Sequence, residues 1–343
     1  MSEKKRVLIT GGCGFIGHHV VEHIIKNTDW EVIVLDKLSY ASSGFGRLRD
    51  IGVFDDRRVT VFAADFTNPL PKGLKEEIGE LNYILHLGAE THVDNSIRDP
   101  GPFIIANVVG TMRMLDFART LASLEKFVYF STDEVFGPAP EGVAYKEWDR
   151  YNSTNPYSAS KAGGEELALA YANTYKLPVI ITHTMNVFGE RQHPEKFVPM
   201  TIRKILNGEK ILIHSDPTKT KAGSRFWIHA KNVASALLFL LEKGQNRDKY
   251  NIVGEREVDN LQMAQFIARV LGKELHYEMI DFHSSRPGQD LRYALDGTKL
   301  AGMGYGFPRT FDESLTNTVK WYFKEGANNV KWLDLRGKDY DEE

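Results

Sequence analysis

The sequence predicts an α/β protein built around a doubly wound parallel β-sheet, with a smaller lobe formed by the C-terminal part of the chain. Two observations lead to this fold class. Short runs of consecutive apolar residues alternate with segments of helical spacing throughout the first half of the sequence. A glycine-rich turn also stands between the first apolar run and the first helical segment, as it does in many sheets of this class.

Six apolar runs are the predicted strands of the sheet. They are continuous rather than alternating, which is typical of parallel strands that are buried on both faces. In chain order they cover residues 7–9, 32–35, 59–62, 83–85, 127–130 and 179–181. Helical spacing over residues 15–27, and a long helix that begins near Tyr157, provide crossovers between them.

The pattern loosens after about residue 188. Short apolar runs at 211–213 and 250–252 mix there with amphipathic segments such as 232–243. We therefore predict a sheet domain over residues 1–188, a lobe formed mainly by 189–332, and a polar tail over 333–343. The pattern leaves open whether segments near 225–245 return to the first domain.

Composition excludes several classes of protein. The chain has 343 residues and a formal net charge of −3, so bulk basicity gives no sign of nucleic-acid binding. No apolar run approaches the roughly 20 residues of a membrane span, and the short charged segment 1–6 does not resemble a signal peptide. The single cysteine, Cys13, permits no internal disulfide and no cysteine-rich metal site. We expect a cytoplasmic protein without a bound metal.

Three glycines at fixed spacing predict a nucleotide site of the Rossmann type. Gly11 permits the tight turn after the first strand, Gly14 lets the backbone approach a pyrophosphate, and Gly17 lets the following helix pack closely. Phe15 and Ile16 complete the turn at the helix N-terminus, where free N–H groups favour anions. The alternative is that these glycines only form a turn.

An acidic residue at the end of the second strand favours NAD. Asp36 suits the ribose hydroxyls of the adenosine, and its negative charge would repel a 2′-phosphate, so NAD is preferred over NADP. Further contacts are expected from strand ends at the same edge of the sheet, and each of these residues could equally be ordinary loop structure. They are Lys37, Asp65, Phe66, Leu87 and Ala89.

Two short motifs carry candidate chemistry. Tyr157 and Lys161 lie four residues apart, so they share one face of a helix, and we expect the lysine cation to lower the pKa of the phenol from its usual ~10. Such a pair can take the proton from an alcohol during oxidation. Thr132 is followed by adjacent carboxylates, Asp133 and Glu134, which could supply an acid and a base for eliminating water. The alternative for the two acids is a solvated loop.

These motifs resemble the extended short-chain dehydrogenase/reductase family and, within it, the nucleoside-diphosphate-hexose 4,6-dehydratases. The resemblance runs from about residue 5 to residue 332. It is carried by the segments 36–41, 90–97, 131–137, 156–162, 193–196 and 286–293. The Thr-Asp-Glu and Tyr-x-x-x-Lys combination is specific to the dehydratase branch, whereas the glycine motif is not.

The resemblance implies a mechanism and a set of ligands. Tyr157 would remove the proton of the sugar 4-hydroxyl while hydride leaves C4, with Thr132 bonded to the same oxygen and Lys161 beside the phenol. Glu134 would then take the C5 proton and Asp133 would protonate the departing 6-hydroxyl, before hydride returns to C6. Tyr157 and Lys161 would also contact the NAD cofactor, and the substrate would be a dTDP- or UDP-glucose type of nucleotide hexose bound by the C-terminal lobe.

Substrate contacts and pairing of subunits also follow from the resemblance. The substrate-binding residues would be Thr91, Asn186, Lys196, Arg225, Asn260 and Arg286, although each arginine could instead form a surface salt bridge. Departures from the family pattern fall in the lobe, at Val187, Phe226, Gln289 and the polar insert 216–223. Relatives form homodimers through two helices, here expected over 102–121 and 157–175.

Two other functions remain open at this point. A sugar-nucleotide 4-epimerase or decarboxylase of the same family would need Tyr157 and Lys161, but an epimerase would need no base at C5. A catalytically silent NAD-binding sensor would need neither that pair nor Asp133 and Glu134. The occurrence of all four residues favours the dehydratase.

Overall fold

The computed structural model describes residues 4–39, 41–281, 291–324 and 329–334. Its centre is a seven-stranded parallel sheet with the order β11-β6-β5-β4-β1-β2-β3. The strands are β1 (Arg6–Thr10), β2 (Glu31–Asp36), β3 (Val59–Ala63), β4 (Tyr83–His86), β5 (Lys126–Thr132), β6 (Val179–Thr184) and β11 (Asp248–Ile252). The strand order reverses beside β1, and the doubly wound, Rossmann-type fold expected from the sequence is confirmed.

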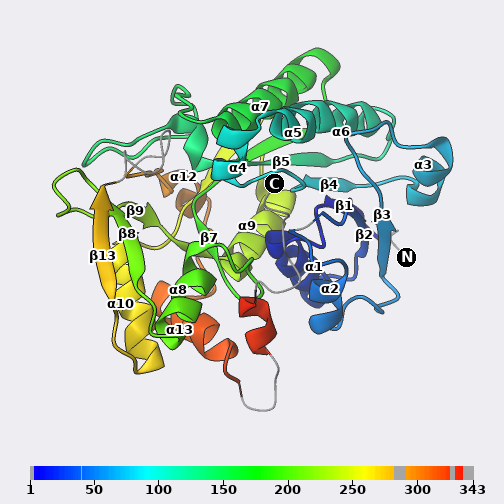
Figure 1. Ribbon diagram of the computed structural model, residues 1–343. Helices are drawn as coiled ribbons and strands as arrows, with labels where there is room; N and C mark the ends of the chain where they lie inside the picture. The colour runs from blue at the N-terminus through cyan, green and yellow to red at the C-terminus, as the bar shows by residue number, and fades with distance from the viewer. Residues whose placement is uncertain (1–3, 40, 282–290, 325–328, 335–343) are drawn as a thin grey trace.

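Helices cover both faces of this sheet, as Figure 1 shows. One face carries α1 (Phe15–Asn27), α2 (Gly46–Asp50) and α9 (Ala230–Lys243). The other carries α3 (Lys72–Ile78), α6 (Gly110–Ala118) and α7 (Pro156–Tyr175), with α4 (Val93–Arg98), α5 (Gly101–Ile104) and the π-helical turn η1 (Ile105–Val109) beside them. Because both faces are covered, the strands read as continuous apolar runs rather than alternating ones.

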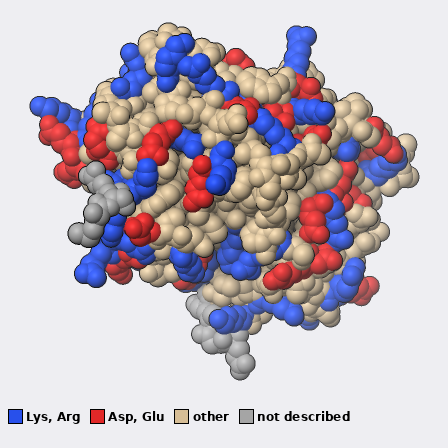
Figure 2. All heavy atoms as spheres, turned by 180° about the vertical axis from the view of Figure 1, so that it is seen from behind, with Lys and Arg blue, Asp and Glu red and all other residues tan. Residues whose placement is uncertain are grey.

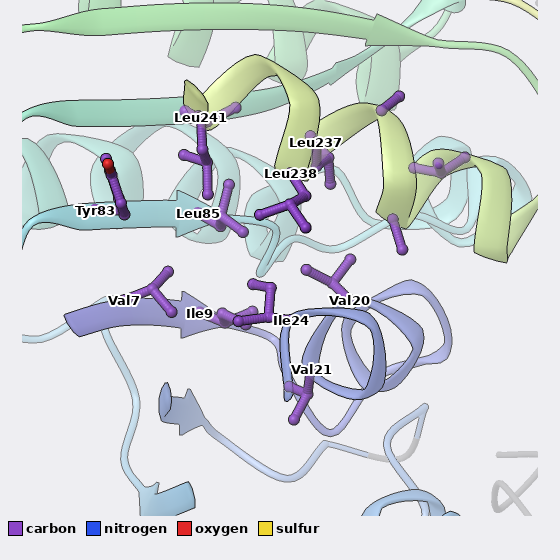
Figure 3. Packing of buried hydrophobic residues seen from close by; sticks show 14 of the residues in the cluster. Val7, Ile9, Val20, Val21, Ile24, Tyr83, Leu85, Leu237, Leu238 and Leu241 are labelled. Atoms are coloured by element: carbon purple, nitrogen blue, oxygen red, sulfur yellow. The ribbon is translucent and has the colours of Figure 1, made fainter. Parts of the chain in front are cut away.

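Packing under α1 and α9 explains why these helices lie where they do. Val7 and Ile9 of β1, Val20 and Ile24 of α1 and Leu241 of α9 belong to one apolar cluster. Ile9 lies beside Ile24, and Leu241 lies over the neighbouring strand β4 (Figure 3). All five side chains are at most 1% exposed. Burying a large aliphatic side chain stabilises a fold by roughly 1.5–3 kcal/mol, so this layer fixes α1 and the glycine turn that precedes it.

The lobe lies to one side of the sheet and has its own apolar core. Its strands pair two by two: β7 (Val187–Phe188) with β10 (Ile228–His229), β8 (Ile211–Ser215) with β13 (Tyr277–Asp281), and β9 (Ser224–Phe226) with β12 (Glu257–Asp259). Its helices are α8 (Phe197–Leu206), α10 (Asn260–Leu271), α13 (Phe311–Trp321) and the turn η3 (Asn329–Leu333). The short helix α12 (Thr298–Gly302) instead packs near β11.

One segment differs from the sequence-based expectation. The apolar run 250–252 is not part of the lobe: it belongs to β11, which pairs in parallel with β6 at the edge of the central sheet. Helix α9, which lies in the segment whose return to the first domain the sequence left open, packs on α1. The chain therefore leaves the sheet after β6 and returns to it, and the continuous apolar character of 250–252 has the same cause as in the other strands. The boundary at residue 188 stays a prediction.

Charge is distributed evenly on the face that Figure 2 shows, where basic and acidic side chains are mixed among uncharged ones. This pattern agrees with the small net charge of the sequence. Among the described residues, no helix combines the length and the apolar character that a membrane crossing requires.

Candidate active site

A cavity of about 350 Å³ opens at the carboxyl ends of the central strands, where sheets of this class bind their ligands. The turn after β1, the ends of β2, β4 and β5, helix α7 and the first loop of the lobe all contribute to it. The predicted site residues that line it are Gly11, Gly14, Phe15, Ile16, Gly17, Asp36, Lys37, Phe66, Leu87, Ala89, Thr91, Thr132, Asp133, Glu134, Tyr157, Lys161, Asn186 and Lys196.

The glycine turn forms a cradle that a larger side chain would fill. Gly11 has a φ of +69°, and a Cβ added at Gly17 would lie 2.1 Å from the carbonyl oxygen of Gly11. Gly14 is the N-cap of α1 and offers no side chain to the first turn of the helix. The N–H groups of that turn therefore face the cavity and suit a pyrophosphate.

Asp36 is held in position by the backbone of two loops. Its carboxylate accepts hydrogen bonds from the Cys13 N–H (2.9 Å) and from the Leu38 N–H (2.8 Å). Burial raises the pKa of Asp36 despite these bonds. Beside it, the Lys37 ammonium pairs with Glu90 at 2.5 Å. The position of the carboxylate at the cavity wall fits two ribose hydroxyls, so the residues present fit NAD.

Asp65 does not line this cavity, unlike its neighbour Phe66. Its side chain is exposed and accepts a hydrogen bond from the Thr67 N–H at 2.9 Å, which closes a local turn. Phe66 is 4% exposed and packs edge-on against His86. The expected contact of Asp65 with adenine stays a prediction.

Three candidate catalytic residues lie where β5 ends: Thr132 is the last residue of the strand and the N-cap of the hydrogen-bonded turn η2 (Asp133–Phe136), which begins with Asp133 and Glu134. The Thr132 hydroxyl donates to the Asp133 carboxylate at 3.0 Å and accepts from the Glu134 N–H at 3.3 Å. Asn155 donates from its side-chain amide to the Glu134 carboxylate at 3.1 Å. Gly137 ends the turn with a φ of +72°, a conformation that favours glycine. The turn fixes both carboxylates at the cavity.

Helix α7 brings Tyr157 and Lys161 to the same cavity. The helix begins with a capping box between Asn155 and Ser158, with Pro156 in its first turn. The Tyr157 N–H also donates to the Ser96 hydroxyl at 3.1 Å. Tyr157 is 8% exposed and Lys161 4% exposed, and their spacing of four residues directs both side chains into the cavity.

Asp133 is poised to act as an acid. Burial and the nearby Glu134 carboxylate raise the pKa of Asp133 from 3.8 to about 7, while the Arg225 guanidinium and the hydrogen bond from Thr132 oppose the shift. The Asp133 side chain therefore holds a proton at neutral pH in much of the population. Two adjacent carboxyl groups with different environments are a suitable acid and base pair.

A pH effect on stability follows from this shift. Folded Asp133 keeps its proton up to about pH 7, whereas the unfolded chain loses it near pH 3.8, so stability falls as the pH rises between these values. We expect Asp133→Asn to raise the melting temperature relative to the parent more at pH 8 than at pH 4. Thermal unfolding at both pH values measures this, and an equal change at both would contradict the burial of an ionisable acid.

The expectation that Lys161 lowers the pKa of the Tyr157 phenol is wrong for the protein without cofactor and substrate. Burial raises the pKa of the phenol, the charges of Glu134 and Asp133 raise it further, and only the hydrogen bond with Thr132 lowers it. Burial also lowers the pKa of the Lys161 amine to about 7. The lysine is thus only partly protonated at neutral pH, and the acidic pair outweighs it.

A second, polar hollow of about 190 Å³ adjoins the first and shares Thr91, Glu134, Asn186, Lys196 and Phe197 with it. Arg225 lines this hollow: its guanidinium lies 4.5 Å from the centre of the Tyr293 ring. The same side chain donates to the carbonyl oxygens of Ser224 (2.6 Å) and Leu291 (2.7 Å). These contacts hold a cation beside the carboxylates, where a diphosphate could sit.

Two predicted substrate-binding residues, Asn260 and Arg286, are not among the described residues that line the two cavities. Asn260 lines neither hollow; it is the first residue of α10, and its backbone N–H donates to Gly223 at 2.9 Å. Arg286 lies outside the described residues, as does Gln289. Of the other departures, Phe226 packs in an apolar cluster with Phe136, and the insert forms a turn between Asp216 and Lys221.

The cavity is also lined by residues that were not among the predicted site residues. Gln192, His193, Phe197 and Trp227 line it from the lobe, and Ser39, Ala41 and Ser42 line it beyond Asp36. Glu195 lies 3.4 Å from a ring nitrogen of His193 and 3.8 Å from one of His92, and so joins two loops at the rim. The segment 193–196 is one of those that resemble the family, and this resemblance could have indicated that the loop contributes to the site. Among the described residues, no cluster of His, Cys, Asp and Glu could hold a metal ion.

Comparisons with known proteins agree with this geometry. Residues 7–253 match the model of the NAD dependent epimerase/dehydratase family. The chain is 35% identical to dTDP-glucose 4,6-dehydratase 1 of Escherichia coli K12, over 96% of this chain and 94% of that protein. It is also 35% identical to a trifunctional UDP-glucose 4,6-dehydratase of Arabidopsis thaliana, over 97% of this chain and 49% of that protein.

A solved structure shows the same architecture. The crystal structure of the dTDP-glucose 4,6-dehydratase DesIV from Streptomyces venezuelae, determined with NAD bound, superposes with a TM-score of 0.84 and 33% sequence identity. The match covers 93% of this chain and 97% of that chain. The likeness therefore includes the lobe as well as the central sheet.

Proposed function

Since the chain belongs to the NAD dependent epimerase/dehydratase family, we propose that it is an NAD-dependent nucleotide-sugar 4,6-dehydratase, a hydro-lyase. It converts a nucleoside-diphosphate hexose of the dTDP- or UDP-glucose type into the 4-keto-6-deoxy sugar. The observation that carries the proposal is the meeting of two chemical pairs in one cavity. Tyr157 and Lys161 face it from α7, and Asp133 and Glu134 face it from η2.

Residues of α7 and Thr132 carry out the first step, the oxidation at C4. Bound NAD accepts the C4 hydride and later returns it to C6. Tyr157 takes the proton of the 4-hydroxyl, and Thr132 orients the same oxygen. Because burial and the two acids disfavour a phenolate, the Lys161 cation is needed beside the reacting tyrosine.

The two carboxyl groups of η2 carry out the second step, the loss of water. A ketone at C4 acidifies the C5 hydrogen. Glu134, held in place by the amide of Asn155, removes it as a proton and returns a proton to C5 when hydride reaches C6. Asp133 donates its proton to the 6-hydroxyl, which leaves as water. The raised pKa of Asp133 provides the protonated form at neutral pH that this donation requires.

The acidic pair separates this function from the alternatives. An epimerase oxidises and reduces C4 without a base at C5 or an acid at C6, and a sensor needs neither. The test is to incubate the protein with a panel of nucleotide hexoses and to analyse the products by mass spectrometry. Loss of one water from a glucose-type substrate supports the dehydratase; a C4 epimer of unchanged mass would support the epimerase.

We expect the purified protein to carry NAD, and external NADP should not replace it. The Asp36 carboxylate is fixed at the cavity wall by two backbone N–H groups and would repel a 2′-phosphate. Mass spectrometry of the released cofactor measures this directly. Mainly NADP in the released fraction would contradict the role of Asp36, and Asp36→Asn should weaken the preference.

We also propose that two copies form a homodimer through α5, η1, α6 and α7. Ile104 and Ile105 are 45% and 53% exposed on this helical face, and Tyr175 is 46% exposed at the end of α7. Exposed aliphatic side chains of this kind mark an interaction surface when they cluster. We expect a dimer by light scattering and a monomer for Ile105→Glu; a monomeric parent would contradict the proposal.

We also propose a cytoplasmic location. It is supported by Cys13, which is buried and unpaired, as expected for a chain that folds in a reducing compartment.

A further inference from the structure

The ammonium group of Lys161 rests on an aromatic ring from the floor of the sheet. Its Nζ lies 4.4 Å from the centre of the Tyr129 ring, well within the ~6 Å of a cation–π contact. Tyr129 belongs to β5 and is completely buried. Its hydroxyl donates to the backbone carbonyl oxygen of Lys161 at 3.0 Å. One side chain thus contacts both the charged end and the backbone of the lysine.

The local packing of α7 preserves this arrangement. A Cβ added at Gly164 would lie 2.4 Å from the Tyr129 hydroxyl oxygen and 2.3 Å from the carbonyl oxygen of Asn107. Only glycine lets the helix approach β5 and η1 this closely. From η1, the Asn107 side chain donates to the Ser160 hydroxyl at 2.9 Å. The turn that carries Lys161 is therefore fixed from two sides.

The other charged groups around Lys161 do not replace the ring. His86 of β4 faces it, but burial and the lysine charge hold the pKa of that imidazole near 3, so it stays neutral. Glu165, one turn further along α7, is engaged by Lys249 (2.9 Å) and His183 (3.0 Å). Among the described residues, no carboxylate forms an ion pair with Lys161, and Asp133 and Glu134 act on Tyr157 instead.

We propose that Tyr129 is a positioning residue for the C4 oxidation: its ring face stabilises the protonated form of Lys161, and its hydroxyl fixes the lysine-bearing turn. The inference rests on the proposed function, in which Lys161 must be a cation beside Tyr157. It explains how a lysine that is 4% exposed can keep a usable charge when burial alone lowers its pKa to about 7.

The test isolates the oxidation from the elimination. A dTDP-hexose that lacks the 6-hydroxyl can lose hydride from C4 but cannot lose water. The role of Asp133 as the acid for water loss therefore does not contribute to the pH dependence of this reaction. Single-turnover oxidation of dTDP-6-deoxyglucose, followed by the absorbance of the reduced nicotinamide, is measured from pH 6 to pH 9. Three variants are compared with the parent: Tyr129→Leu, Tyr129→Phe and Phe127→Leu.

Tyr129→Leu removes the ring, so the Lys161 pKa should fall and the alkaline limb of the profile should move to lower pH by about one unit. Tyr129→Phe keeps the ring, so the alkaline limb of its profile should stay at the pH of the parent. Phe127 is equally buried on the same strand and packs in the same cluster, so Phe127→Leu controls for general loss of packing and should leave the limb in place.

The inference would be overturned if the alkaline limb of the Tyr129→Leu profile stayed at the pH of the parent. It would also be overturned if Phe127→Leu shifted the limb as far as Tyr129→Leu. If Tyr129→Leu does not fold, trifluorophenylalanine at position 129 keeps the shape but weakens the negative face of the ring, and the same shift is expected in part; no shift there would also overturn it. A parent that oxidises this substrate but never dehydrates dTDP-glucose would contradict the proposed function alone, since an epimerase uses Lys161 in the same way.

Discussion

Tyr157→Phe is expected to lower turnover by about 10²–10⁴-fold or more, the usual contribution of a positioned general base. The substitution removes the proton acceptor and keeps the aromatic ring, which is buried beside Phe103. Folding and NAD content should therefore change little. Steady-state turnover on the preferred nucleotide hexose, together with the cofactor content of the purified variant, measures the effect.

A matched control lies on the same helix. Tyr171 is also a tyrosine of α7, but its hydroxyl donates to Asp116 at 2.9 Å, away from the cavity. Tyr171→Phe should keep activity near that of the parent. If Tyr157→Phe retained most of its activity, or if both variants lost it equally, α7 would not be the catalytic helix.

Glu134→Gln should stop the reaction after oxidation. Glutamine keeps the shape of the side chain and can still meet the Asn155 amide, but it cannot accept the C5 proton. Tyr157 and Lys161 are unchanged, so the 4-keto hexose should form and accumulate without losing water. In deuterium oxide, exchange at C5 should be suppressed, and nuclear magnetic resonance of the sugar detects this.

Asp133→Asn should give the opposite pattern. The base Glu134 is intact, so C5 should still exchange with solvent, while the loss of water slows because no acid protonates the 6-hydroxyl. The parent should itself slow in this step as the pH rises through about 7, the pKa of Asp133. If both variants dehydrated the substrate at the parent rate, the two carboxylates would be ordinary loop residues.

The local features of the fold could be predicted because each depends on a short stretch of sequence. Helix α1 covers the residues that its spacing indicated, since the apolar stripe and the glycine turn lie next to each other in the chain. The pairing of Tyr157 with Lys161 follows from helical geometry alone. The place of Asp133 and Glu134 at the cavity follows from their position directly after β5, because the strand ends meet at one edge of the sheet.

Features set by distant parts of the chain could not be predicted in the same way. The run 250–252 looks like any short apolar strand, and only its partner β6 places it in the central sheet. The direction of the Tyr157 pKa depends on burial and on the sum of several charges, so a motif containing one lysine suggested the wrong sign. The contact of Lys161 with the Tyr129 ring joins residues that no spacing rule connects.

The central claim is that one cavity moves a hydrogen from C4 to C6 while water leaves. A glucose nucleotide that carries deuterium at C4 tests it most directly, with the product examined by nuclear magnetic resonance and mass spectrometry. The account predicts a 4-keto-6-deoxy product with the deuterium in its C6 methyl group. Deuterium that remains at C4 of a sugar with all its oxygen atoms would contradict the account.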